Sequence, residues 1–133
     1  NKKAFSAGLP YTILGFNLRM NQTYDVKFEC SGDPEVYWNS EQSDNKKEHT
    51  FTPTTEEDCY PIVLIKGNIT SLNFCDNSGQ PLAEGNSYIE AICLSNTITD
   101  IPAFAFYNGL EGIKLWISNI RRFTGMVSAS HEK

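Results

Sequence analysis

Histidines and closely spaced cysteines are scarce in this chain of 133 residues. The only histidines are His49 and His131, and none of the four cysteines lies in a Cys-x-x-Cys pair. A zinc site usually draws on such pairs and on histidines, so these counts argue against one. Hydrolytic catalysis needs a nucleophile and a base that a third group holds in place. We expect His49 at an exposed strand end and His131 in a terminal tail, and therefore predict neither an enzyme nor a metal or cofactor site.

Basic residues and long apolar runs are also few. Eleven Lys and Arg stand against sixteen Asp and Glu, and the formal net charge is -5. This balance argues against nucleic acid as a partner, because its binders gather Lys and Arg on one face. No apolar run approaches the length of about 20 residues that a membrane-spanning helix needs.

The acidic run Glu56-Glu57-Asp58 contains no Gly and lacks the spacing of a calcium loop, so it predicts a solvated loop. The chain opens with Asn1-Lys2-Lys3 and no apolar segment, which indicates a mature or trimmed chain.

Strand patterns dominate the rest of the sequence. Hydrophobic residues make up 40 %, which suits one globular domain. Between residues 24 and 30 apolar and polar residues alternate, as in a half-buried strand. The apolar run 61–66 has Pro only at its start and predicts a central strand covered on both faces. Further strands are predicted over residues 11–20, 35–39, 49–53, 87–94, 98–108 and 112–120, with at most one short helix.

Many short strands with turn signals between them predict an all-β protein, an antiparallel β-sandwich. A turn is expected at residues 76–79, and the polar stretch 40–48 is expected to be an exposed loop. We divide the chain into an N-terminal extension over 1–10, a single β-sandwich domain over 11–128 and a C-terminal tail over 129–133.

The cysteines and two glycosylation sequons bear on the compartment. An even cysteine count permits two disulfides, with three alternative pairings. The sequons begin at Asn21 and Asn68. Together these features favour a secreted, oxidising setting, and the alternative is a cytosolic chain whose buried thiols act as small hydrophobes. The disulfide candidates are Cys30, Cys59, Cys75 and Cys93.

Tyr37 and Trp38 are the most informative aromatic residues. Adjacent strand residues point to opposite faces of a sheet, so one of the two faces outward unless both faces are covered. An exposed Tyr or Trp is a suitable anchor for a sugar or a protein. Both residues are therefore candidate ligand contacts.

Several segments resemble galectins in their order and spacing. Tyr11-Thr12-Ile13-Leu14-Gly15 is similar to the early "ITILG" strand of that family, and Pro81-Leu82-Ala83-Glu84-Gly85 is similar to its "PFxxG" segment. The sugar motif of the family, His-x-Asn-Pro-Arg, is followed nine residues after the Pro by an apolar strand, as Pro53 is followed here by Ile62. Residues 110–128 resemble the closing strand. The resemblance covers most of residues 11–128 and implies a jelly-roll sandwich that binds a glycan.

The residues that read the sugar in galectins are mostly replaced. Thr50, Thr52 and Thr54 stand where the family has His, Asn and Arg, and Lys66 stands where it has a second Asn. Three Thr hydroxyls cannot supply the forked, charge-assisted bonds of Arg. The resemblance therefore implies that ordinary β-galactoside binding is largely lost.

A second part of the galectin motif falls near Phe74. Phe74 takes the approximate place of the stacking Trp, with one extra residue before it, and we expect its ring to stack on a sugar. The acidic residue and the Arg that follow that Trp have no clear match around Asp76. Asn73 and Asp76 complete the set of candidate contacts.

These patterns predict an extracellular binding module, a divergent galectin-like domain that recognises a glycan or a glycoprotein surface. The alternative is a secreted β-barrel or sandwich that binds a partner protein without a sugar site, through the loop 40–48. Residues 14–18 with Cys30 downstream resemble some fungal allergens and effectors. Cys30 with Trp38 also resembles part of an immunoglobulin domain, although their spacing is too short for that family.

Overall fold

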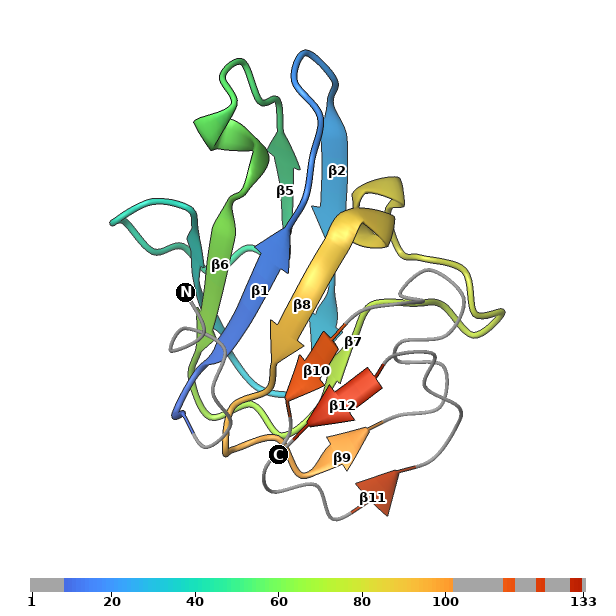
Figure 1. Ribbon diagram of the computed structural model, residues 1–133. Coiled ribbons are helices and arrows are strands. Elements are labelled where there is room, and N and C mark those ends of the chain that lie inside the picture. Colours follow the sequence, from blue (N-terminus) through green and yellow to red (C-terminus); the bar gives the residue numbers. More distant parts are fainter. Residues whose placement is uncertain (1–8, 102–113, 117–121, 124–129, 133) are drawn as a thin grey trace.

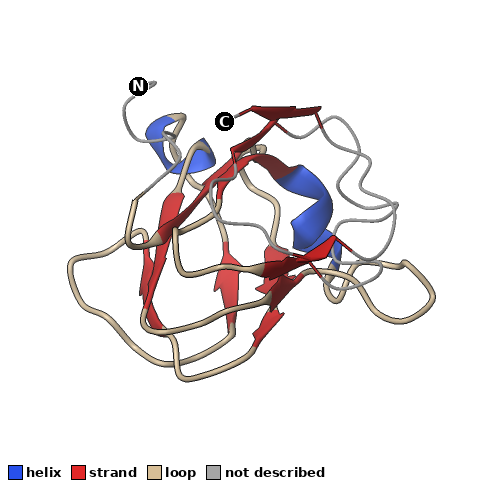
Figure 2. Cartoon of the chain, turned by 90° about the horizontal axis from the view of Figure 1, so that it is seen from below, coloured by secondary structure: helices blue, strands red, loops and turns tan. Residues whose placement is uncertain are grey.

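Short strands make up nearly all of the regular structure in the computed structural model, which describes residues 9–101, 114–116, 122–123 and 130–132 (Figure 1). Two 3-10 helices are the helical elements of the described residues, and Figure 2 shows how short they are beside the strands. The all-β prediction is confirmed. The elements are β1 Thr12–Phe16, β2 Tyr24–Lys27, β3 Glu29–Cys30, β4 Glu35–Trp38, β5 Glu48–Phe51, η2 Glu57–Cys59, β6 Ile62–Lys66, β7 Leu72–Asn73, η3 Glu84–Tyr88, β8 Ile89–Cys93, β9 Asp100–Ile101, β10 Lys114–Trp116, β11 Arg122–Phe123 and β12 Ser130–Glu132.

The largest sheet has six strands in the order β12-β10-β8-β1-β6-β4. The apolar run predicted as a central strand is β6, which pairs with β1 on one side and β4 on the other. Its inner residues Val63 and Ile65 are fully buried. Its outer face is only partly covered, because Ile62 is 36 % exposed. The prediction that both faces are covered is therefore wrong for this strand.

Two shorter strand pairs, β2 with β5 and β3 with β7, supply the rest of the core. The predicted alternation over 24–30 is confirmed, because Tyr24, Val26 and Phe28 are buried while Asp25 and Lys27 are exposed. Buried residues of β2 and β5 form one hydrophobic cluster with inward residues of β1, β4, β6 and β8. The arrangement is therefore sandwich-like.

Aromatic rings fill much of the space between these strands. Phe16 and Phe51 lie with ring centroids 5.5 Å apart, and Phe28 lies 6.0 Å from Trp38 and 6.4 Å from Phe74. Phe28 and Phe74 are fully buried. Burial of such rings removes large apolar areas from water and provides much of the stability of a domain of this size.

The loop between β4 and β5 folds back on the edge of the large sheet. The Val36 amide donates to the Asp44 carbonyl at 2.7 Å, and the Asp44 amide donates to the Val36 carbonyl at 2.8 Å. Residues 40–46 are exposed, as predicted for this loop. By pairing with Val36, the loop occupies backbone groups that an edge strand would otherwise offer to another chain.

The C-terminal part departs from the antiparallel pattern. β10 runs parallel to both β8 and β12, and β11 runs parallel to β9. The strand β12 falls within residues 129–133, which were predicted as a tail. Most of the strands predicted over 98–108 and 112–120 lie outside the described residues. The segment 84–88, which overlaps the predicted strand 87–94, is the 3-10 helix η3.

Candidate functional site

A groove of about 750 Å³ lies over the exposed face of β2 and β5, which run side by side in Figure 1. The register places Asp25 opposite Thr50, Val26 opposite His49 and Lys27 opposite Glu48. Because alternate residues of a strand share a face, the side chains of the first and third pairs point outward together. The groove is lined by Asp25, Val26, Lys27, Asp44, Lys46, Glu48, His49, Thr50, Leu82 and Ala83.

The groove surface carries charged side chains of both signs and a hydroxyl group. The Thr50 hydroxyl donates to Asp25 Oδ1 at 2.7 Å. Lys27 and Glu48 are directly opposite partners of opposite charge on neighbouring strands. The lining holds three carboxylates and two ammonium groups, so its formal net charge is -1 when His49 is neutral.

The wall formed by Leu82 and Ala83 is fixed to β2 through Asn86. This side chain is fully buried, accepts a bond from the Lys27 amide at 3.1 Å and donates to the Lys27 carbonyl at 2.7 Å. It also donates to the Phe74 carbonyl at 2.9 Å. Asn86 therefore pairs with the free edge of β2 as a neighbouring strand would.

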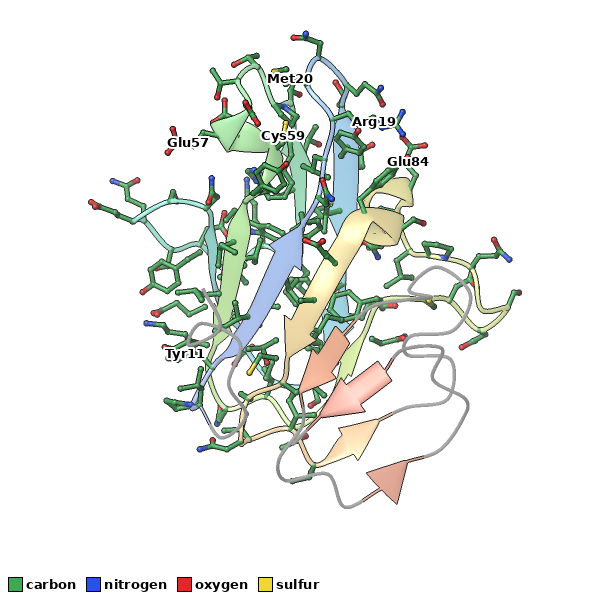
Figure 3. The ribbon with its side chains drawn as sticks, viewed as in Figure 1. Tyr11, Arg19, Met20, Glu57, Cys59 and Glu84 are labelled. Atoms are coloured by element: carbon green, nitrogen blue, oxygen red, sulfur yellow. The ribbon has the colours of Figure 1, made fainter. Side chains whose placement is uncertain are left out.

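Gly85 brings η3 close to the same strand. A side chain at this position would collide with the Asp25 carbonyl and would lie 3.0 Å from Val26 Cγ2. Glycine is needed here for space, since the backbone of η3 touches the backbone of β2. Figure 3 labels Glu84 at the start of η3.

The opposite wall comes from the loop 40–48. The Lys46 amide donates to Asp44 Oδ1 at 3.0 Å, and the Phe28 amide donates to the Lys47 carbonyl at 2.9 Å. With the bridge from Asp44 to Val36, these bonds hold the loop beside β5. The loop and Thr50 were separate candidates in the sequence, and they line one groove.

His49 connects the groove with the aromatic core. Its ring stacks on Trp38 with centroids 5.1 Å apart and planes 11° apart, and it meets the edge of Phe51 at 4.7 Å. Burial lowers the pKa of His49 below its ordinary value, with Asp44 opposing and Lys46 adding to this effect. The imidazole is therefore neutral at pH 7.

Tyr37 and Trp38 face opposite sides of β4, as predicted. Trp38 is only 6 % exposed and points into the core, so the expectation that it could anchor a ligand is wrong. Its indole Nε1 is the one buried side-chain polar atom of the described residues without a hydrogen-bond partner. Tyr37 is half-buried on the outer face.

Lys66 lies beside Tyr37, away from the groove. Its Nζ is 4.9 Å from the Tyr37 ring centroid and 5.4 Å from that of Tyr11, which Figure 3 shows at the start of β1. The Tyr37 hydroxyl donates to Glu35 Oε1 at 2.8 Å. Lys66 and Thr50 belong to different sheets, so the two halves of the galectin-like motif do not meet in one site.

Thr52 and Thr54 lie beyond the end of β5, outside the groove. The Thr52 and Thr23 hydroxyls are 3.4 Å apart, and the Thr54 hydroxyl donates to Asp58 Oδ2 at 3.4 Å. Both Thr are exposed. Of the three Thr residues singled out by the resemblance, only Thr50 lines the groove.

Phe74, Asn73 and Asp76 do not form a sugar platform. Phe74 is fully buried against Phe28, so the prediction that its ring stacks on a ligand is wrong. Asn73 lines a separate hollow of about 320 Å³ with Glu29 and Cys30. Asp76 Oδ1 accepts bonds from Ser78 and Gln80 amides at 2.8 and 3.0 Å, so its carboxylate holds the predicted turn.

No disulfide joins the four cysteines, all of which lie in the described residues, so the disulfide prediction has no support in this structure. The Cys59 thiol donates to the Thr55 carbonyl at 3.5 Å, and that of Cys30 donates to the Gly32 carbonyl at 3.9 Å. Burial raises the pKa of Cys30, and it raises the pKa of Cys93 to about 11. Cys59, Cys75 and Cys93 are buried, whereas Cys30 is half-buried.

Both sequon asparagines lie on exposed turns. Asn21 has a φ of 64°, and its amide donates to the Pro53 carbonyl at 2.7 Å. Asn68 follows Gly67, which has a φ of 113°. Their side chains are exposed, and their glycosylation stays a prediction.

Sequence reasoning missed most of the groove. Asp25, Lys27 and His49 were not candidate contacts, although the alternation over 24–30 had placed the first two on an exposed face. The missing information was the register between β2 and β5, which are separated in the chain by β3, β4 and their connecting segments. A local pattern shows which residues share a face, but not which strand lies beside them.

Comparison with models of known protein families, with curated proteins and with solved structures gave no match. In the described part of the chain, no helix is long and apolar enough to cross a membrane. The same residues contain no group of three His, Cys, Asp or Glu side chains that could hold a metal ion. What defines the protein is therefore its all-β fold with a polar groove that carries charges of both signs.

Proposed function

We propose that this protein is an extracellular binding module, not an enzyme, and that its groove holds a neutral, hydroxyl-rich ligand such as an oligosaccharide. The observation that carries the proposal is the groove over β2 and β5, where carboxylates, ammonium groups and the Thr50 hydroxyl converge. Sugar hydroxyls both donate and accept hydrogen bonds, so they suit a surface that offers both kinds of partner. Ligand sites commonly combine such placed polar groups with an apolar wall, here Leu82 and Ala83.

The charge pattern favours a neutral ligand. Asp25 accepts a bond from Thr50, and Lys27 is the register partner of Glu48, so an added ionic group of either sign would meet a like charge as well as an opposite one. A neutral hydroxyl can bond to either member of such a pair without a large cost of desolvation. Binding should accordingly depend little on salt, because exposed charge attraction is what salt screens.

Thr50 is the one residue of the galectin-like motif that supports a sugar site in this groove. This residue stands where the family has its sugar-reading His, and it lines the groove. The aromatic plane on which a sugar rests in galectins has no equivalent here, since Phe74 is in the core. We therefore expect weak binding and a ligand other than an ordinary β-galactoside.

A protein partner is the second candidate, and one observation favours it. Asp44, Lys46 and Glu48 come from the loop 40–48, which the sequence singled out for protein contacts, and all three line the groove. A glycoprotein could bind through its glycan in the groove and its polypeptide on the loop. The extracellular setting rests on the exposed sequons at Asn21 and Asn68.

Isothermal titration with neutral oligosaccharides tests the proposal. The panel contains lactose, N-acetyllactosamine, maltotriose, cellotriose, chitotriose and mannotriose. Thr50→Val keeps the β-branched shape but removes the hydroxyl, and loss of one hydrogen bond should weaken binding by about 10-fold. Thr52→Val is the matched control, because Thr52 is exposed on the same stretch but lies outside the groove.

The outcomes separate the two candidates. Binding that Thr50→Val weakens and Thr52→Val leaves unchanged supports an oligosaccharide groove. Equal effects of the two substitutions would place the ligand elsewhere on the protein. No binding by any oligosaccharide of the panel would refute the glycan proposal and leave the protein partner as the candidate.

A further inference from the structure

The edge of β5 that faces away from β2 carries unused backbone groups. In an antiparallel pair, residues that exchange backbone hydrogen bonds alternate with residues whose N–H and C=O groups point outward. The Lys27 backbone bonds to the Asn86 side chain, on the side of β2 away from β5. Its register partner Glu48 therefore directs its own backbone groups away from β2, and so does Thr50 two residues later.

The same register continues one step beyond the end of β5. The Thr52 and Thr23 hydroxyls are 3.4 Å apart, as expected for the next pair on the same face after Asp25 and Thr50. Thr52 thus belongs to the same outward set as Glu48 and Thr50. All three residues are exposed, and within the described residues their outward backbone groups have no hydrogen-bond partner.

Neighbouring edges of the sandwich are covered, whereas this one is open. Asn86 occupies the outward groups of Lys27 on β2, and the bridge from Asp44 occupies those of Val36 on β4. The backbone bonds of the loop 40–48 to the strands go to Val36 and Phe28 and not to the outer edge of β5. The outward positions of β5 also carry neither Lys nor Pro, the residues that commonly protect an edge from pairing with another strand.

We propose that two copies of this protein pair through their β5 strands, antiparallel and about a two-fold axis at Thr50. This register places Thr50 opposite Thr50 of the second copy and Glu48 opposite Thr52 of the second copy. Each opposite pair exchanges two backbone bonds, so the interface gains about six hydrogen bonds. The two-stranded sheet of β2 and β5 is extended by its symmetry mate, and a larger sheet is more stable than an isolated strand pair.

The side chains along this edge are complementary to themselves. Thr meets Thr at the axis, a cross-strand pair that stabilises sheets, and Glu48 meets an uncharged Thr. The two Glu48 carboxylates stand roughly 13 Å apart along the strands, which exceeds the screening length of about 8 Å at physiological salt. A register centred on Glu48 would oppose the two carboxylates directly. Self-complementarity of this kind is what a two-fold interface between identical chains requires.

The symmetry has a consequence for the groove. The two-fold axis stands perpendicular to the joined sheet, so the outer faces of both strand pairs lie on the same side. The two grooves then open on one surface, and a ligand with repeated units can engage both, which raises its overall affinity without a new kind of contact. The pairing of the strands itself goes beyond the proposed function and does not depend on it.

Sedimentation velocity of the full chain from about 1 to 500 µM measures the dissociation constant of the dimer. Thr52→Glu places a carboxylate opposite Glu48 in both symmetric pairs, whereas Thr52→Lys places an ammonium group there. Gln80→Glu and Gln80→Lys are the matched controls. They make the same changes of net charge on an exposed turn that belongs to neither β2 nor β5.

The two Thr52 variants should move the dissociation constant in opposite directions. Thr52→Glu should weaken the dimer by about 5-fold and Thr52→Lys should tighten it by about 5-fold, because two like or opposite charge pairs act in each dimer. The Gln80 variants should stay within about 2-fold of wild type.

Thr50→Pro tests the backbone bonds. It removes an amide donor that β2 does not use, so the protein should fold but remain monomeric. Near-UV circular dichroism checks the fold. If Thr50→Pro does not fold, the opposite shifts of the two Thr52 variants decide alone.

Two results would overturn the pairing. The first is a wild-type protein that stays monomeric over the whole range, in which case the edge is left to a strand of a different protein. The second is a dimer whose dissociation constant neither Thr52 variant changes, because such a dimer forms through another surface. The oligosaccharide titrations are scored separately, so failure of the pairing and failure of the proposed function are distinguishable.

Discussion

Asn86 should be a principal structural support of the groove, and its removal gives a prediction that the contacts make quantitative. Asn86→Ala deletes three hydrogen bonds, two to the Lys27 backbone and one to the Phe74 carbonyl. The Lys27 amide and carbonyl lose their partner, whereas the Phe74 carbonyl still accepts from the Leu82 amide at 2.9 Å. At about 1 kcal/mol for each bond, the unfolding free energy should fall by about 3 kcal/mol.

Urea unfolding measures this loss directly. With an m-value of about 2 kcal/mol per molar urea, a loss of about 3 kcal/mol lowers the midpoint by about 1.5 M. Asn17→Ala is the control, because Asn17 is exposed and its side chain makes no hydrogen bond within the described residues. That control should change the free energy by no more than about 0.5 kcal/mol. A midpoint shift below about 0.5 M for Asn86→Ala would show that this amide does not hold β2 to η3.

Three further predictions concern separate features of the fold. Gly85→Ala should destabilise the protein by about 1–3 kcal/mol in the same urea assay, because the new methyl group meets the Asp25 carbonyl; a neutral effect would contradict that close approach. Because the pKa of His49 is lowered in the folded state, stability should be complete above about pH 6.5 and fall as the pH drops below it, and His49→Gln should flatten the change in melting temperature. Iodoacetamide at pH 8 should label Cys30 before Cys93, whose pKa is about 11; equal labelling rates in mass spectra of the native protein would be inconsistent with this burial.

The fold could be predicted from local patterns to the level of strands and their faces. The alternation over 24–30 identified which residues of β2 are buried, because burial on one face imposes a period of two. Tyr37 and Trp38 were correctly placed on opposite faces of β4, but the pattern could not tell which of the two faced the core. The parallel pairing of β10 with β8 had no local signal, since parallel partners are chosen by long-range contacts.

The site was less predictable than the fold, and Phe74 shows the physical reason. Its position in the sequence resembled that of a sugar-stacking ring, yet the folded chain buries it against Phe28. An aromatic residue stabilises a core as well as a binding surface, and only tertiary packing decides between these uses. Thr50 was a candidate because it stands where the galectin motif has its His, whereas Asp25 required the register between β2 and β5.

Chemical-shift mapping is the most direct measurement of whether the groove binds a neutral ligand. Uniformly ¹⁵N-labelled protein is titrated with each oligosaccharide of the panel at pH 7.5, and amide shifts are followed by heteronuclear correlation spectra. Binding in the groove predicts that the shifts concentrate at Asp25, Lys27, Glu48, Thr50 and Ala83 and that they become smaller in Thr50→Val at the same ligand concentration. Shifts centred instead on Tyr37 and Lys66, or no shifts with any oligosaccharide, would contradict it.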